Sequence, residues 1–493
     1  MVPFESGPLP LFLVVLAALM IASAVLSWPS QRAGVPAVLG FLALGIIAGR
    51  TGLAALLSGS YRSSFNFGTV ALVLILFDGG LNTPFALLNR GLLPAALLAT
   101  VGVVASSGLF AIGGKMLDFS WHEAFLLGAI VAPTDAAAVF PILRGSGLQL
   151  KRRIATTLEL EAGLNDPVAV ALTIALSQSL AYHQPVSAAT VMAVPLGLAA
   201  GSLIGIAVGY GGRLLLLYSH LFAGGLYPIM TLALALFAFG LATMVHGSGF
   251  LAVYIAALVL GNVQLPYRAG ILRVHDAAAW LCQIGLYLML GSLTTPSELL
   301  AVAPAGIALA LFLAVLARPI SVAICLLPLK YSLSEIVYIG WVGLRGAIPI
   351  VLATYPVMIG AANAPVIFKI VFFIVLVSTL VPGATVRWVT ALLGLQSNEQ
   401  PAPPALLEII STRMLSGAEI SSFSIYQSAA ACGARISELP LPPDSMLILL
   451  IRDSELIPPR GSTVLQKDDH VYVLCRAEDR PIVHLIFGHS EED

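Results

Sequence analysis

The chain has 493 residues, of which 58% are hydrophobic and only 10% are charged, and its mean hydropathy is +0.96. Soluble globular domains carry about 25% charged residues, so this composition excludes a soluble globule and predicts a polytopic all-α membrane protein. The net charge of −1 favours no class of partner, and nothing in the chain predicts nucleic-acid binding.

Thirteen apolar stretches are candidate transmembrane helices, because a span requires about 20 apolar residues. Their approximate limits are 9–27, 35–53, 66–82, 91–114, 122–142, 154–181, 188–217, 223–244, 247–263, 274–293, 300–328, 335–358 and 365–393. The first stretch has no basic flank before it and no small-residue cleavage site after it. It is therefore expected to be a retained helix and not a signal peptide.

The distribution of basic residues predicts the orientation. An odd number of spans places the termini on opposite sides, and an outer N-terminus leaves little more than Arg62 and Lys115 in the outer loops. The inner loops then carry Arg32, Arg90, Arg144, Lys151, Arg152, Arg153, Arg213, Arg268, Arg273 and Lys330. The positive-inside rule therefore predicts a cytoplasmic C-terminus.

The composition changes after the last span, which predicts three parts: a transmembrane domain at 1–395, a polar, proline-bearing linker at 396–405, and a cytoplasmic domain at 406–493. In the last part, 446–452 and 470–475 have the pattern of buried strands, and 457–461 that of a turn. A small α/β domain is expected. It contains no GxGxxG motif, so a dinucleotide-binding Rossmann unit is not predicted.

Two acidic motifs lie in consecutive spans: Thr134-Asp135 after Pro133, and the run from Glu161 to Asn165-Asp166. A carboxylate in the hydrocarbon layer is costly, and such residues usually bind or carry something. Each aspartate lies about 20 Å along its helix, so antiparallel neighbours bring both near the midplane. The two motifs together predict ion transport.

Both halves of the membrane domain contain an interrupted span. Pro133 removes a backbone donor, and a broken helix there frees carbonyls as cation ligands, with the Thr134 carbonyl or hydroxyl as the first candidate. The second interruption is the glycine-rich, proline-containing segment 343–349 around Arg345. Paired broken helices are typical of the binding sites of inverted-repeat transporters.

Helical spacing sorts the second motif into two faces. Asp166 shares a face with Ala162, whereas Glu161 and Asn165 share a face about 100° away. Asp166 is therefore predicted to bind the proton and the cation, and Glu161 to face a structural partner, for which Arg345 is the candidate. Glu159 lies on the Asp166 face two turns nearer the cytoplasm, where it either lines an access funnel or is a solvated helix end.

Several features have simpler interpretations. Asp78 is compatible with a helix-packing hydrogen bond, and Arg345 with a purely structural counter-charge. The segment Val208-Gly209-Tyr210-Gly211 resembles a channel filter, but Gly201, Gly205 and Gly209 form a stripe that favours helix packing. The segment 246–249 is expected to be a turn between spans. No nucleophile with an oriented base is evident, so an enzyme is not predicted, and a channel lacks a credible filter.

The Thr134-Asp135 pair, ELEAGLNDP at 159–167, FDGGL at 77–81 and GLRGA at 343–347 resemble the monovalent cation/proton antiporter superfamily, specifically its NhaP-type electroneutral branch. The resemblance implies a homodimer in a bacterial inner membrane with a role in pH homeostasis. It also implies about 13 helices with inverted repeats, crossed broken helices and an elevator-like mobile core.

By that resemblance Asp166 is the ion-binding carboxylate, Asp135 and Thr134 belong to the crossed unwound helix, and Glu161 pairs with Arg345. The family often has serine at the position of Ala162, so one side-chain oxygen is lost here. Asn165 stands where electrogenic relatives carry a second aspartate, which implies one proton per cation.

The tail resembles the C-terminal lobe of regulator-of-potassium-conductance domains in the run ELPLPPDSMLILLIRDSELIPPRGSTVLQKDDHVYVL at 438–474, although Lys467-Asp468-Asp469 replaces the more usual glycine-aspartate. Antiporters with such a lobe are mostly potassium/proton exchangers, which favours potassium over sodium as the exchanged ion. No cofactor is expected for transport, and an adenine nucleotide or a cyclic dinucleotide is the expected regulator. A sodium/proton antiporter is the alternative, and a sensor with secondary transport is a further one.

Overall fold

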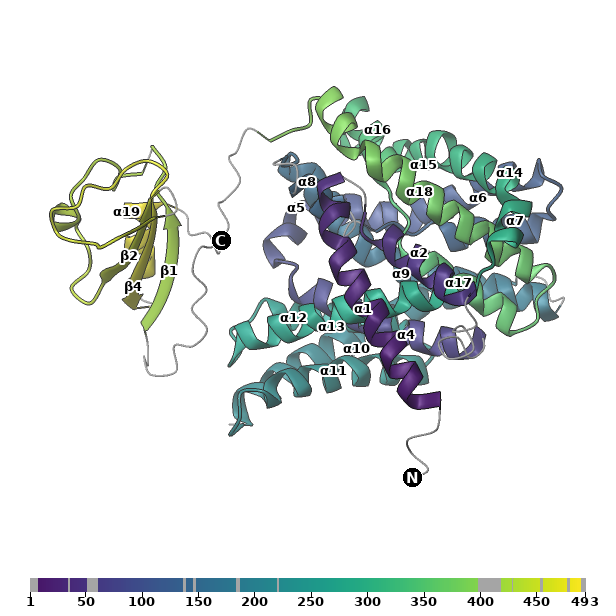
Figure 1. Cartoon of the computed structure of the whole chain (residues 1–493), viewed down its shortest axis with the longest axis horizontal. Helices are drawn as coiled ribbons and strands as arrows, with labels where there is room; N and C mark the ends of the chain where they lie inside the picture. The colour runs from purple at the N-terminus through teal and green to yellow at the C-terminus, as the bar shows by residue number, and fades with distance from the viewer. Residues whose placement is uncertain are drawn as a thin grey trace. The chain divides into compact units, whose positions relative to one another are not determined.

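The computed structural model describes residues 8–33, 36–50, 61–135, 139–144, 148–182, 187–219, 221–397, 418–427, 429–452, 455–476 and 479–488. The chain forms two compact units, residues 1–398 and 399–493. The first is helical and the second is built on a small sheet (Figure 1).

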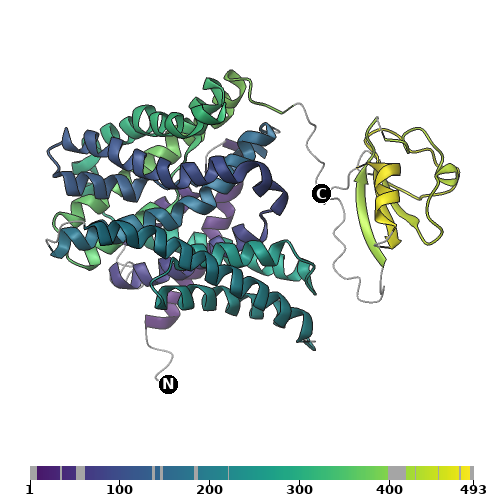
Figure 2. The ribbon, with the colours of Figure 1, turned by 180° about the vertical axis from the view of Figure 1, so that it is seen from behind.

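The first unit contains two groups of helices, of which the first packs around α12 and α13. Figures 1 and 2, seen from opposite sides, both show α10 to α13 side by side. The members of this first group are α1 (Pro8–Ala33), α2 (Val38–Arg50), α4 (Tyr61–Leu81), α10 (Ala188–Tyr218), α11 (Leu226–Met244), α12 (Gly249–Gly261) and α13 (Arg268–Ser292).

The second group contains both acidic motifs. Its members are α5 (Phe85–Leu97), α6 (Val103–Lys115), α7 (Trp121–Val131), α8 (Val139–Arg144), α9 (Arg152–Tyr182), α14 (Pro296–Phe312), α15 (Arg318–Leu326), α16 (Leu333–Val342), α17 (Ala347–Met358) and α18 (Ala364–Leu392). Two π-helical turns, η1 (Leu98–Gly102) and η2 (Leu313–Ala317), join α5 to α6 and α14 to α15, and a short 3-10 turn, η3 (Leu327–Leu329), follows α15.

One order of elements occurs twice in the second group. A helix pair joined by a π turn is followed by a broken helix and then by a long helix, first in α5 to α9 and again in α14 to α18. Both broken helices begin at a capping box, formed by Ser120 with Glu123 and by Ser332 with Glu335. In each box the serine and the glutamate satisfy backbone donors of the first turn reciprocally.

The capping glutamates also tie the two halves together. Glu123 Oε1 accepts a hydrogen bond of 2.6 Å from Asn363, the residue before α18. Glu335 Oε2 lies 3.9 Å from the Arg153 guanidinium in the first turn of α9. Each broken helix thus contacts the start of the long helix of the other half, as expected for the predicted inverted repeats.

Each of the thirteen predicted apolar ranges overlaps at least one described helix, while residues 35, 51–53 and 136–138 of these ranges lie outside the described part of the chain. By length and hydropathy, seven helices in the described ranges are long and apolar enough to cross a membrane, or eight if the bent pair α16–α17 is one span. Shorter apolar helices include α2, α7 and α12. The mostly helical membrane fold is confirmed, whereas the total of thirteen crossings stays a prediction.

The glycine stripe on α10 packs against α12. A side-chain carbon added at Gly205 would lie 3.0 Å from Ala252 Cα, and one at Gly209 would lie 2.8 Å from Val259 Cβ. These two helices therefore approach more closely than any side chain on the stripe would allow. The packing interpretation of the filter-like segment is confirmed. Residues 246–248 lie in the turn between α11 and α12 as predicted, and Gly249 begins α12.

The second unit is a four-stranded antiparallel sheet with the order β1-β4-β2-β3. Its elements are β1 (Ala418–Ser424), η4 (Ile436–Glu438), β2 (Met446–Arg452), β3 (Glu455–Ile457), β4 (His470–Arg476) and α19 (Arg480–Phe487). Phe423, Leu450, Val471 and Phe487 are fully buried in its core. The predicted strands 446–452 and 470–475 are confirmed.

Most of the predicted linker, 396–405, lies outside the described residues. Its first two residues extend the membrane unit, since Gln396 pairs with Leu150 in an antiparallel bridge and the Ser397 amide donates to the Gln149 carbonyl at 2.8 Å.

Candidate functional site

Two interrupted helices meet inside the second group. Helix α7 ends at Val131, the next residues to Asp135 are not helical, and α16 and α17 are bent by 55° at their break. The Asp135 amide donates a 2.8 Å hydrogen bond to the Leu344 carbonyl, which joins the two breaks directly. The crossed broken helices predicted from Pro133 and the 343–349 segment are therefore present.

Glycines make this close approach sterically allowed. A side-chain carbon added at Gly343 would lie 2.9 Å from the Arg345 guanidinium and 3.0 Å from Thr134 Cγ2. One added at Gly346 would lie 3.0 Å from Asp135 Cβ. Larger residues at either position would push the two breaks apart.

Arg345 stabilises the ends of the half-helices. Its Nε donates to the Val131 carbonyl at 2.7 Å, and its Nη1 donates to the Gly343 carbonyl. These carbonyls lie at the C-terminal ends of α7 and α16, where the helix dipole places partial negative charge. The buried guanidinium thus compensates both helix ends at once.

The predicted ion pair between Glu161 and Arg345 is wrong, because Glu161 pairs with a different arginine. Glu161 Oε1 pairs instead with Arg318 Nη2, and both side chains are at most 1% exposed. Arg345 is occupied by the backbone carbonyls of the breaks, whereas Arg318 begins α15 and reaches α9 from the side. A charged residue inside the apolar stretch 300–328 was the signal that could have identified Arg318.

A hydrogen-bond chain links this ion pair to the first break. Thr134 Oγ1 donates to Glu161 Oε1 at 3.5 Å and accepts from Asn165 Nδ2 at 2.8 Å. Arg318, Glu161, Thr134 and Asn165 therefore form one network, and Glu161 and Asn165 lie on the same face of α9 as their spacing predicted. The network fixes the break against α9.

Asp166 lies outside that network. It is 4% exposed, and its Oδ1 has no hydrogen-bond partner among the described residues. Half-buried Asp135 is near enough for the two charges to interact. A buried carboxylate without a counter-charge is unfavourable unless it is protonated or binds a cation, and that is the chemistry the arrangement can perform.

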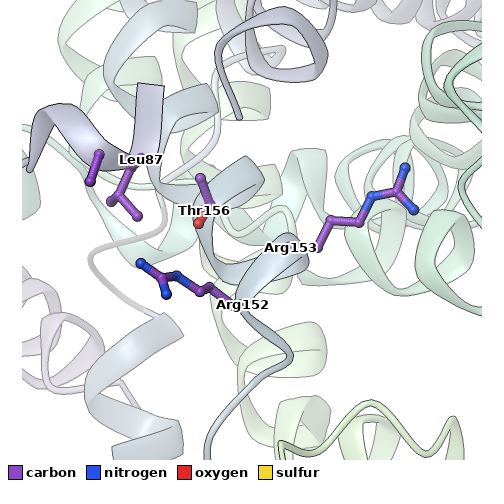
Figure 3. Close-up of a pocket in the computed structure, with 5 residues that line it drawn as sticks. Leu87, Arg152, Arg153 and Thr156 are labelled. Atoms are coloured by element: carbon purple, nitrogen blue, oxygen red, sulfur yellow. The ribbon is translucent and has the colours of Figure 1, made fainter. Parts of the chain in front are cut away.

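A hollow between α5 and α9 lies apart from Asp166. It has a volume of about 320 Å³ and is lined by Ala86, Leu87, Arg152, Arg153 and Thr156 (Figure 3). Figure 3 shows Arg153 extending away from Leu87, and its guanidinium donates to the Leu329 carbonyl at 2.8 Å. Arg152 is about 21 Å along α9 from Asp166, so this hollow is not the carboxylate site.

Crossed broken helices around an uncompensated buried carboxylate define a membrane ion transporter. A family model described as sodium/hydrogen exchanger, transmembrane, matches residues 15–392, and a TrkA-C domain model matches residues 420–481. The chain therefore belongs to the sodium/hydrogen exchanger family, which consists of cation/proton antiporters, and its second unit is a TrkA-C domain.

Named relatives agree with this assignment. A protein named K(+)/H(+) antiporter NhaP from Alkalimonas amylolytica is 36% identical over 482 residues, covering 97% of this chain and 83% of that protein. K(+)/H(+) antiporter NhaP2 from Shewanella baltica (strain OS223) is 36% identical over 489 residues, covering 98% and 84%. The sodium proton antiporter MjNhaP1 from Methanocaldococcus jannaschii has the same fold, with a TM-score of 0.67 at 21% identity over 79% of this chain and 100% of that chain.

The buried pair yields a stability prediction. Arg318→Ala should destabilise the protein by ~3–5 kcal/mol, because the Glu161 carboxylate would stay buried without a counter-charge. The expected result is a clear fall in the melting temperature of the purified protein in detergent.

The pair between Lys369 and Glu298 provides a matched control. It also joins two helices, at 3.0 Å, but its side chains are 28% and 54% exposed. Lys369→Ala should cost only ~0–1 kcal/mol, since exposed pairs contribute little. Equal losses for the two variants would contradict the structural importance of Arg318.

Proposed function

We propose that this protein is a secondary-active, electroneutral potassium/proton antiporter in which the cation and the proton compete for Asp166. The observation that carries the proposal is the division of charges around α9. Arg318 compensates Glu161 and Arg345 compensates the half-helix ends, whereas Asp166 Oδ1 has no partner among the described residues. A cation or a proton supplies the missing compensation.

The cation ligands are proposed to come from Asp166, Asp135, Thr134 and Asn165. The Thr134 hydroxyl is already bonded to Asn165 and Glu161, which favours its carbonyl as the ligand. Asn165 Oδ1 is buried without a hydrogen-bond partner in the described part of the chain, so it is a second neutral oxygen donor. Ala162 supplies no oxygen, and water takes that position.

Competition at one carboxylate couples the two fluxes. Protonation and cation binding each neutralise Asp166, and the neutral site is the one that crosses between the two faces of the membrane. The second group of helices carries the site, so it is proposed to move in an elevator-like way against the first group. With a proton gradient directed inward, cytoplasmic potassium leaves.

Potassium is favoured over sodium because the relatives at 36% identity are named K(+)/H(+) antiporters. Sodium is the alternative, since a relative 26% identical over 351 residues is named Na(+)/H(+) antiporter NhaS2 from Synechocystis. The protein is proposed to act as a homodimer in a bacterial inner membrane, with its N-terminus outside and its C-terminus in the cytoplasm.

The central test is Asp166→Asn. An amide neither releases a proton nor carries a formal charge, so exchange of potassium for protons in proteoliposomes should be lost while the variant stays folded and dimeric. Asp118→Asn, in an exposed turn, is the matched control and should exchange as the wild type does. Exchange at the wild-type rate by the Asp166 variant would refute the assignment.

Stoichiometry gives an independent prediction. Because Asn165 does not titrate, each cycle should exchange one cation for one proton, and an imposed membrane potential should leave the initial rate unchanged. The measurement is potassium efflux at a fixed pH gradient with and without a thiocyanate gradient. A rate that follows the potential would mean that a second charge moves in each cycle.

The TrkA-C domain is proposed to regulate transport by binding an adenine nucleotide or a cyclic dinucleotide. A ligand shifts a conformational equilibrium only through its different affinities for the two states. Deletion of residues 398–493 keeps the Gln396–Leu150 bridge and should leave an active antiporter whose rate no longer responds to these nucleotides. If the full-length protein transports at equal rates with and without each nucleotide, the proposed regulation by nucleotides is refuted.

A further inference from the structure

Helix α9 carries a polar stripe that extends well beyond the acidic motif. Glu159, Asp166 and Thr173 are spaced by seven residues, and Ser177 follows four residues later. At about 100° per residue, all of them lie within about 20° of the Asp166 direction, and the stripe is about 27 Å long. It therefore has the length of a membrane crossing.

The two hydroxyl-bearing residues of the stripe are fully buried. Thr173 and Ser177 are 0% exposed, and neither hydroxyl has a hydrogen-bond partner within the described ranges. Hydroxyls in helices of this protein commonly bond to the carbonyl four residues earlier, as Thr157 does to Arg153 and Ser202 to Leu198. Because a buried unpaired hydroxyl costs free energy, helix packing alone does not explain these two side chains.

Neighbouring helices contribute to the same region. Ser64 on α4 is also 0% exposed, with a hydroxyl that lacks a partner in the described chain. It lies one turn before Gly68, where an added side-chain carbon would touch Val351 of α17. Gln178, next to Ser177, donates to the Tyr355 hydroxyl at 3.2 Å. The part of α9 between Asp166 and Tyr182 therefore packs together with α4 and α17.

The ends of these three helices line an open hollow of about 510 Å³. It is lined by Tyr61 and Arg62 of α4, Tyr182 of α9, and residues 357–359 at the end of α17. Tyr182 is five residues beyond Ser177 on α9. In the proposed orientation this hollow faces the outer side, so the polar stripe leads from Asp166 towards it.

We propose that Thr173, Ser177 and Ser64 form an outer binding region for the monovalent cation, on its path between Asp166 and the outer face. Hydroxyl oxygens replace part of the hydration shell as the cation approaches the carboxylate, as other protein oxygens do in ion pathways. Ser64 belongs to the first group of helices and the other two residues to the second. The path thus lies where the two groups meet and opens when they move apart.

This inference rests on the proposed antiport. It is tested by comparing the cation KM at the outer face of the membrane with the cation KM at the inner face. Thr173→Val keeps the shape of the side chain and Ser177→Ala keeps its burial, but both remove the hydroxyl. In the double variant the cation KM at the outer face should rise roughly tenfold, the scale of a lost bond to a charged group. The cation KM at the inner face should change by less than about twofold. Right-side-out and inside-out vesicles give the two values.

Variants that retain the two hydroxyls distinguish the effect of ion contact from the effect of packing. Thr173→Ser and Ser177→Thr should retain the wild-type KM at the outer face, and Ser202→Ala, which removes a hydroxyl bonded to its own helix, should leave both faces unchanged. Equal KM changes at both faces, or none, would overturn the inference. Absence of exchange in the wild type would instead refute the antiport itself.

A labelling experiment covers the case in which the double variant does not fold. In a chain without its four native cysteines, Ser177→Cys should react with an impermeant thiol reagent added outside during turnover, and potassium should slow the reaction. Val168→Cys, in an apolar cluster with Val103 and Ala132, should not react. Labelling of Ser177→Cys from the inner side only would place the path elsewhere.

Discussion

The backbone crossing at Asp135 and Leu344 is the constraint on which the membrane unit depends. An interrupted helix exposes donors and acceptors that lipid cannot satisfy, so irregular backbone at this depth must be buried in protein. Here the two breaks satisfy each other through the Asp135 amide and the Leu344 carbonyl, and Arg345 satisfies two further carbonyls. Gly343 and Gly346 make the approach possible, and the same crossing holds Asp135 near Asp166.

The charges around this crossing have separate roles. Burying a charge is tolerated when a partner compensates it, and leaving one uncompensated is costly. Arg318 compensates Glu161, and Arg345 compensates the dipoles of two half-helices. No arginine remains beside Asp166 among the described contacts. The charges of Glu161 and of the half-helix ends are thus neutralised inside the protein, whereas Asp166 Oδ1 has no partner among the described residues.

Sequence reasoning predicted the parts of this site that depend on local geometry. The breaks follow from Pro133 and from the glycines around Arg345, and the separation of Asp166 from Glu161 and Asn165 follows from the helical period. The partner of Glu161 could not be predicted in this way. Arg318 is 157 residues away, and its direction depends on how α15 rotates after the π turn η2. A pattern within one helix contains no information on that rotation.

The two repeats have one architecture but different chemistry. Helix α9 follows the first break and provides Asp166, while α18 follows the second and provides Thr379, whose hydroxyl donates to the Arg345 carbonyl at 3.1 Å. The long helix of the second repeat therefore supplies a neutral side chain that stabilises its own break, whereas the long helix of the first repeat supplies a buried carboxylate. Since the capping glutamates tie each break to the long helix of the other half, a displacement of one repeat is transmitted to the other. Two contacts of this kind, one at each break, therefore join the two repeats into a single packed unit.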